Sequence, residues 1–329
     1  ALVQQLQEHL IQVTEAYWDL YAARAEFFQR LRLLEAAEST LDTLVARQRV
    51  DAVQRQVLRA RAAVASRKSE IARAHTSIRN AESRLRLLVN DPVLVNAGSQ
   101  EFAPAEPPLM APLPCSMEES LYDALQNRPD ISQAIRDIRA ASVRLGVAQN
   151  EVLPKLDLVT STYVAGLAGR SDVGQSLLRE FDAGRPSFAV GFAFETPFGN
   201  RAARAQEERR QWEMQRAFAQ FRLTVEEALT DVEVAVREVH TNYREVVGKY
   251  HAMVAVTDEA DYLFDRWRNL PGMDDSAVLL LEDLLDAQER AAIAESELVR
   301  AATGYAVSIM RLKQEMGTLL IATPCGGGS

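Results

Sequence analysis

The chain has few of the residues that interrupt secondary structure, with 15 glycines and 12 prolines among 329 residues. This scarcity predicts long uninterrupted elements rather than several small domains, because separate cores need many turns. No run of about 18 apolar residues is present, which excludes a transmembrane helix, whereas transmembrane strands give a much weaker signal. The sequence opens at Ala1, inside a helical pattern and without a signal-peptide leader, so we expect that an upstream segment has been removed.

Residues that carry chemistry are also scarce. The two cysteines and four histidines are scattered and match neither a zinc spacing nor a redox motif, so we expect no metal and no cofactor. The sequence has no phosphate-binding loop, and no nucleophile, base and orienting group occur in a recognisable arrangement, which argues against an enzyme. The net charge of −9 argues against a nucleic-acid partner, because such binding depends on neutralising phosphates with Lys and Arg.

Helical periodicity dominates the sequence that is present. Residues 1 to 48 carry apolar side chains in alternating steps of four and three, which is typical of a coiled-coil seam. A second apolar stripe beside the first predicts that this helix lies between two neighbours. Residues 52 to 89 repeat the rhythm, and the short joint near Val50 and Asp51 predicts an antiparallel hairpin. The first seam consists of Leu6, Leu10, Val13, Tyr17, Leu20, Phe27, Leu31, Leu34 and Leu41.

A second helical pair follows near the end of the chain. The pattern from about 202 to 268 would extend roughly 100 Å if continuous, and a turn at Asn269–Gly272 separates it from a returning helix over about 276 to 319. Polar as well as apolar residues match between the two hairpins, as in Ser69–Ala74 against Ser296–Ala301. We therefore predict a duplicated helical hairpin whose two copies superpose.

The middle of the chain changes character twice. Six prolines over 91–116 forbid a continuous helix and predict an extended connector. A helix then begins near Ser116, with Glu118 and Glu119 in its first turn, and resumes beyond Pro129.

Period-two alternation replaces the helical rhythm after Pro154. Leu156–Ala165 alternates loosely and is rich in β-branched residues, and Ser187–Glu195 alternates strictly, which predicts two strands. Each is about as long as a tilted strand that crosses a bilayer. The apolar side chains of the second strand, which we expect to face the membrane, are Phe188, Val190, Phe192 and Phe194.

The order of these elements, and motifs at their joints, resemble the TolC-like outer-membrane efflux channels. Asn127–Asp130 and Leu153–Leu156 resemble the family's approach to a barrel strand, and Thr196–Arg201 resembles the exit from the returning strand. Asp283–Ala287 resembles the start of the helix that returns from the periplasmic end. Each motif alone is weak, but their order and spacing extend over almost the whole chain.

The resemblance implies a mainly α fold in which very long antiparallel coiled-coil helices form an α-barrel tunnel. A transmembrane β-hairpin would contribute to a trimeric β-barrel in the outer membrane, with the helices extending into the periplasm. The divisions are a helical hairpin of the first repeat over 1–90, the proline-rich equatorial connector over 91–116 and a helix leading to the barrel over 117–152. A transmembrane hairpin with a long external loop over 153–197, the hairpin of the second repeat over 198–320 and a tail over 321–329 follow.

The implied function is export of solutes through a homotrimer, without catalysis. A periplasmic adaptor, an inner-membrane transporter and outer-membrane lipid would be its partners, because the chain itself has no energy source. The sequence departs from the family in having only the descending and returning helices of the first repeat. A periplasmic coiled-coil scaffold or adaptor without a pore would show the same heptads, but it would not need an apolar strand face.

The resemblance also suggests which residues form the channel entrance. Asp283 and Asp286 match paired aspartates that line the periplasmic entrance in the family, and Asp274 and Asp275 lie in the adjoining turn. A spacing of three places Asp283 and Asp286 on one side of a helix, where a trimer would hold two stacked acidic rings that attract cations. Ordinary solvated carboxylates are the alternative. The equivalent positions of the first repeat are Gln56 and Arg59, and Arg59 is a possible ion-pair partner of the acidic residues.

The family's architecture would finally place the connector and the chain end in one belt around the tunnel. Because the periplasm is oxidising, a disulfide between Cys115 and Cys325 is possible there. Two unpaired cysteines are the favoured alternative, since Cys325 lies in a Gly-rich tail.

Overall fold

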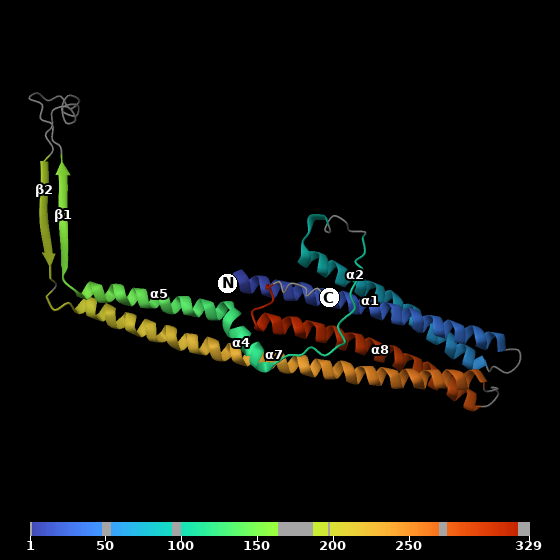
Figure 1. Ribbon diagram of the computed structural model, residues 1–329. Helices are drawn as coiled ribbons and strands as arrows, with labels where there is room; N and C mark the ends of the chain where they lie inside the picture. Colours follow the sequence, from blue (N-terminus) through green and yellow to red (C-terminus); the bar gives the residue numbers. More distant parts are fainter. Residues whose placement is uncertain are drawn as a thin grey trace, which may run out of the picture. The chain divides into compact units, whose positions relative to one another are not determined.

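The computed structural model describes residues 2–47, 54–93, 100–163, 187–196, 198–269 and 275–321. The described chain is mainly α-helical, with one pair of strands (Figure 1). Its elements are α1 (Leu2–Arg47), α2 (Gln54–Val89), α4 (Met117–Asn127), α5 (Pro129–Val152), β1 (Lys155–Tyr163), β2 (Ser187–Glu195), α7 (Arg201–Asn269) and α8 (Asp275–Glu315). The chain divides into two compact units, one formed by residues 1–129 and 225–329 and the other by residues 130–224.

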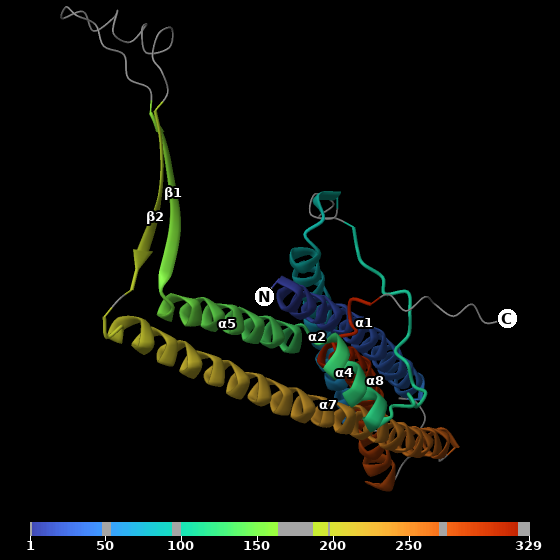
Figure 2. The ribbon, with the colours of Figure 1, turned by 60° about the vertical axis from the view of Figure 1, so that its left-hand side comes forward.

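The first unit is built from α1, α2, α8 and the part of α7 after residue 224. Helix α1 packs against α2 along one flank and against α8 along the other, as the two views in Figures 1 and 2 also show. The prediction that residues 1 to 48 contact two neighbours is therefore confirmed. The joints at 48–53 and 270–274, where the sequence predicts the hairpin turns, lie outside the described residues.

Each helical pair of this unit has its own apolar core. Between α1 and α2, Leu20 is fully buried against Ile78 and Leu85. Between α7 and α8, Val232 and Tyr305 are fully buried in a second cluster. Burying a side chain of this size contributes about 1.5–3 kcal/mol, so the heptad seams account for how the hairpins are held together.

Helix α7 has 69 residues, and most of its buried side chains after residue 224 recur with a seven-residue period. Val232, Val239, Val246, Ala260 and Trp267 are buried at intervals that are multiples of seven, as a coiled-coil seam requires. Helix α8 has only 41 residues and packs against this part of α7. The predicted pairing of 202–268 with 276–319 therefore holds for the part of α7 after residue 224. Residues 201–224 of α7 belong to the second unit instead.

Duplication of the hairpin remains a prediction, but burial at equivalent positions supports it in part. Ala60 and Ala287, which the repeat offset pairs, are both buried at 1% and 0% exposure. Leu58 is exposed whereas its counterpart Leu285 is buried in the cluster that α8 forms with α1, α2 and α7. The second copy therefore has an additional contact at this position.

The proline-rich connector is attached to the first hairpin through Glu82. This carboxylate is 2% exposed and accepts hydrogen bonds from the Arg24 guanidinium at 2.8 Å and from the backbone amide of Phe102 at 3.1 Å. Arg86 lies over the Phe102 ring, 4.9 Å from its centroid. A buried carboxylate needs such partners, because an unpaired buried charge is strongly destabilising.

The other end of the connector is attached to the second hairpin through Tyr305. Its hydroxyl accepts from the backbone amide of Leu113 at 2.9 Å and donates to the carbonyl of Ala111 at 3.1 Å. The connector has no helix or strand at these positions, so side chains of α2 and α8 supply bonds that regular structure would otherwise provide.

The second unit contains α5, the strands and the N-terminal part of α7. Figures 1 and 2 show α5 running beside that part of α7. The buried side chains of α5 are mostly small, with Ala134, Ala141 and Ala148 repeating every seven residues, which allows close helix packing. At the C-terminal end of α5, the Val152 carbonyl accepts a hydrogen bond from the side-chain amide of Asn200, just before α7, at 2.8 Å.

The strands pair antiparallel along their whole length, from Lys155 opposite Glu195 to Tyr163 opposite Ser187. Both strands lie where the sequence predicts them, and the segment between them lies outside the described residues. A turn containing Gly199 leads from β2 to α7, and its φ of +79° is one that L-residues with side chains rarely adopt.

Candidate functional site

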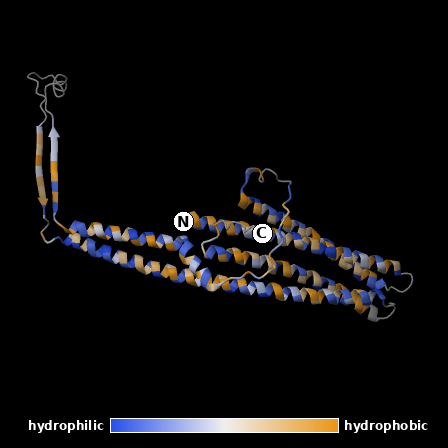
Figure 3. Cartoon of the chain, in the orientation of Figure 1, coloured by the Kyte–Doolittle hydropathy of each residue, from blue (hydrophilic) through white to orange (hydrophobic). Residues whose placement is uncertain are grey.

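The strand pair presents one strongly apolar face. The side chains predicted to face the membrane share that face and are all highly exposed, at 74% for Phe188, 70% for Val190, 77% for Phe192 and 66% for Phe194. In the register of the pair, Leu156 lies opposite Phe194 and Leu158 opposite Phe192, so the same face continues onto β1. Figure 3 shows hydrophobic colouring over much of β2.

The opposite face of the strand pair is more polar. Lys155 lies directly opposite Glu195, an arrangement that favours opposite charges. Asp157 and Ser161 follow on the same face of β1 and alternate there with Val159 and Tyr163, which are 52% and 61% exposed. One face is therefore suited to lipid and the other to water, as in strands of a transmembrane barrel. Contact with lipid remains a prediction.

The predicted entrance aspartates lie on α8 beside a buried seam. Asp283 and Asp286 are exposed, whereas the neighbouring Leu284 and Ala287 are fully buried. Both carboxylates therefore face away from the core of the first unit. Asp275 begins α8, but its side chain is outside the described residues, as is the whole of Asp274.

The core beneath these carboxylates joins all four long helices of the first unit. Leu281 and Leu284 of α8 pack with Leu44 of α1, Val57 of α2 and Trp267 of α7 in one buried cluster. The Arg47 guanidinium also lies over the Trp267 ring, 5.8 Å from its centroid. The two exposed aspartates are thus carried on a well-packed support.

Arg59, which the sequence offered as a partner of the entrance aspartates, pairs with a neighbouring acid. Its Nε lies 3.7 Å from Glu282 Oε1, one residue before Asp283. Gln56, the other equivalent position, is buried at 3% exposure. The first repeat therefore contributes a cation near the acidic side of α8.

Sequence reasoning missed Arg67, a buried cation that links three helices. It is 4% exposed, and its guanidinium donates to the Leu33 carbonyl of α1 at 3.2 Å, and to the Leu285 carbonyl and the Gln288 side chain of α8 at 3.2 and 3.3 Å. Burial lowers the pKa of Arg67 from its ordinary value, and the charge of Glu289 opposes that shift. The signal was present in the sequence, because Arg67 occupies the seam position between Val64 and Ile71.

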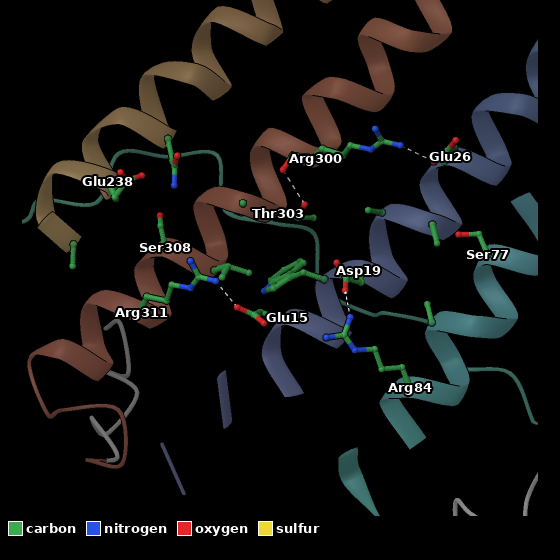
Figure 4. A pocket seen from close by; sticks show the side chains of 18 of the residues that line it. Glu15, Asp19, Glu26, Ser77, Arg84, Glu238, Arg300, Thr303, Ser308 and Arg311 are labelled. Atoms are coloured by element: carbon green, nitrogen blue, oxygen red, sulfur yellow. Dashed lines mark hydrogen bonds and ion pairs between the residues drawn. The ribbon is translucent and has the colours of Figure 1, made fainter. Parts of the chain in front are cut away.

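A groove of about 1110 Å³ runs over α1, α2, α7 and α8 within the first unit (Figure 4). Ion pairs cross it between helices, joining Arg311 to Glu15 at 2.6 Å and Arg300 to Glu26 at 3.1 Å. Glu238 and Ser77 also line it. Its lining combines side chains of both charge signs with small residues. It is therefore a polar groove and differs from the mostly apolar pockets that bind small molecules.

Cys115 packs at the edge of the core between α7 and α8. Burial raises the pKa of its thiol above the ordinary value, because the thiolate loses solvation. Cys325 lies outside the described residues, so the disulfide remains a prediction.

The described residues contain no group of three or more His, Cys, Asp or Glu side chains arranged to hold a metal ion. None of their helices has an apolar stretch long enough to cross a membrane.

Comparison with solved structures shows which known fold the chain has. The chain is similar to the outer-membrane protein VceC of Vibrio cholerae, with a TM-score of 0.71 and 20% identity over 96% of this chain and 71% of VceC. It is also similar to the open state of the MtrE outer-membrane channel of Neisseria gonorrhoeae, with a TM-score of 0.73 and 22% identity over 96% of this chain and 68% of MtrE. The chain has the TolC-like fold. At these identities, the likeness concerns the fold.

Sequence comparison adds a weaker relationship. The TolC-like chain is 29% identical to Nodulation protein T of Rhizobium leguminosarum bv. viciae over 196 residues, which are 58% of this chain and 36% of that protein. The match therefore spans about a third of the curated relative. No protein-family profile matches the chain.

Proposed function

We propose that the chain is a subunit of a trimeric outer-membrane channel that exports solutes from a periplasmic entrance to the exterior. The observation that carries this proposal is the strand pair, whose large apolar side chains on one face are 60% to 77% exposed in a chain with the TolC-like fold. A soluble scaffold has no need to expose such a face, whereas a strand in a lipid-facing barrel wall does.

The trimer and the barrel belong to the same proposal. A single hairpin cannot enclose a pore and leaves unpaired backbone groups on both outer edges, which a bilayer does not tolerate. Neighbouring copies would supply the missing strand partners, and the long helices of each copy would together line the tunnel. The chain would then act as a conduit and not as an enzyme.

An efflux pump requires further components, which we propose as partners. The sequence contains no phosphate-binding loop, so an inner-membrane transporter would supply the energy and a periplasmic adaptor would join it to the channel. The exposed Asp283 and Asp286 would face the periplasmic entrance and favour cations, as charged rings do in other pores.

Single-channel recording of the full-length protein in planar bilayers tests this proposal. We expect discrete conductance steps with cation preference, and a reduced preference in the double variant Asp283→Asn/Asp286→Asn. The matched control is Glu118→Gln/Glu119→Gln, which removes the same charge from exposed positions in the first turn of α4. Absence of conductance would favour a scaffold without a pore. Equal selectivity in the two double variants would remove the entrance role from the aspartates.

A further inference from the structure

The break between α4 and α5 consists of one residue, Arg128. Its φ of −64° and ψ of 128° are extended, because the ring of the following Pro129 disfavours helical backbone at this position. The Arg128 amide still donates to the Ala124 carbonyl at 3.0 Å, so α4 ends in an ordered manner. The chain changes direction here for a reason encoded in two adjacent residues.

The C-terminus of α8 is closed by a glycine-containing turn. Gly317 has a φ of +71°; its amide donates to the Gln314 carbonyl at 2.9 Å, and the Thr318 amide donates to the Lys313 carbonyl at 2.9 Å. These two bonds define a Schellman motif with glycine at its left-handed position. They do not use the carbonyl of Glu315, the last residue of α8.

Arg128 supplies a donor to that carbonyl. Its Nη1 lies 3.3 Å from the Glu315 carbonyl oxygen and 2.8 Å from the Glu315 carboxylate, and its Nη2 lies 3.3 Å from the carboxylate of Asp231 on α7. The side chain is only 12% exposed. A cation at a helix C-terminus is favoured by both the unpaired carbonyls and the helix dipole.

Gly317 brings the two backbones into direct contact. A Cβ built on it would lie 2.6 Å from the Asn127 carbonyl carbon, 2.7 Å from the Asn127 oxygen and 2.8 Å from the Arg128 nitrogen. These neighbours are backbone atoms and cannot swing aside. Gly304, inside α8, has no atom within 4 Å of an added Cβ, so only one of these two glycines is required by a close approach.

We propose that Arg128, Asp231, Glu315 and Gly317 form a lock in which Arg128 caps α8 from another part of the chain. The lock holds the α4–α5 break against the end of α8. All four residues belong to the first unit, so the role of the lock is to fix the end of α4 against the end of α8 within that unit. The lock belongs to the folded subunit, so this inference does not depend on transport.

Hydrogen–deuterium exchange of the full-length protein in detergent tests the lock. We compare Gly317→Ala with Gly304→Ala, and Arg128→Met with Arg136→Met, since Arg136 is exposed on α5. In the two lock variants we expect amides of 127–131 and 313–318 to exchange at least about tenfold faster, because hydrogen bonds to charged groups contribute more than neutral ones. The controls should leave these rates unchanged.

Two further variants separate capping from charge pairing. Glu315→Gln removes a carboxylate but keeps the backbone carbonyl, so we expect a smaller effect than in Arg128→Met. Arg128→Lys retains the cation and should restore part of the protection. Equal rates in lock and control variants would overturn the proposal. Faster exchange that extends equally to residues 281–287 would also overturn it, since that pattern indicates a general loss of stability. If Gly317→Ala does not fold, the comparison of Arg128→Met, Arg128→Lys and Arg136→Met decides alone.

Discussion

The helical unit and the strand pair treat apolar side chains in opposite ways. In the helices, Leu20, Val232 and Leu284 are completely buried within the chain. In the strands, Phe192 is 77% exposed and its neighbours on the same face are similar. The apolar seams of the helices are thus buried within one subunit, whereas the apolar strand face can be covered only by lipid or by another molecule. A two-stranded sheet is also only marginally stable by itself.

The largest effect that we expect concerns the strand face. Phe192→Arg should sharply reduce the amount of protein assembled in the outer membrane, because a cation on the lipid side of a barrel strand costs about 2–4 kcal/mol near the bilayer centre. Ala193→Arg, one residue further on the opposite face, should assemble nearly as the parent does. Heat-modifiable oligomer in the membrane fraction, measured by gel mobility, checks both. Equal loss in the two variants would remove the distinction between the faces.

A second prediction tests the helical side of the comparison. Leu284→Ala should destabilise the first unit by about 2–5 kcal/mol, as expected for a fully buried leucine. Leu279→Ala, at a position that is 61% exposed on the same helix, should change stability by no more than about 0.5 kcal/mol. Denaturant unfolding followed by circular dichroism measures both values. Similar values would show that the seam of α8 is not buried in solution.

A third prediction concerns the connector. Tyr305→Phe removes the hydroxyl that bonds to Leu113 and Ala111, and it should cost about 1–2 kcal/mol because two backbone groups lose a partner. Tyr262→Phe is the control, since Tyr262 is 63% exposed on α7. Limited proteolysis within 100–115 should also become faster in Tyr305→Phe alone. Unchanged cleavage would mean that Tyr305 does not hold the connector.

The smallest effect is expected at Cys115. Burial raises the pKa of its thiol, so any stability that this group contributes is present below its unfolded pKa and is lost as the pH rises through the folded pKa. Alkylation of Cys115 by iodoacetamide in the folded Cys325→Ser variant should therefore require a higher pH than alkylation of the same variant when denatured, because the thiolate is the nucleophile. Identical pH profiles of the two rates would contradict this environment.

The elements of the fold were largely predictable because they follow from local periodicity. Ser187–Glu195 is a strand at the predicted bounds, and the long periodic segment after Pro197 forms one continuous helix, α7. The alternation of Phe188 with small residues also showed which side chains share a face. What periodicity could not show is how much of α7 pairs with α8, because that depends on where the shorter helix ends.

The polar contacts that hold the unit together were less predictable. Arg67 interrupts the apolar seam of α2 and Glu82 lies directly beside it, but a charged residue at such a position can be buried and paired or can mark an exposed turn of the helix. Arg128 and Gly317 are 189 residues apart in the chain, and nothing local to either indicates the other. For the predicted entrance, the exposure of Asp283 and Asp286 agrees with both a lumen and ordinary solvation, so their role remains a prediction.

The central claim is that the apolar strand face contacts lipid, and quenching by brominated lipids measures this most directly. In a full-length protein in which Trp18, Trp212, Trp267 and any tryptophan outside this sequence are replaced by Phe, a single tryptophan is introduced either as Phe192→Trp or as Ala193→Trp. After reconstitution into vesicles with bromine in the acyl chains, the account predicts strong quenching of fluorescence at position 192 and little at position 193. Equal quenching at both positions, or none at position 192, would contradict it.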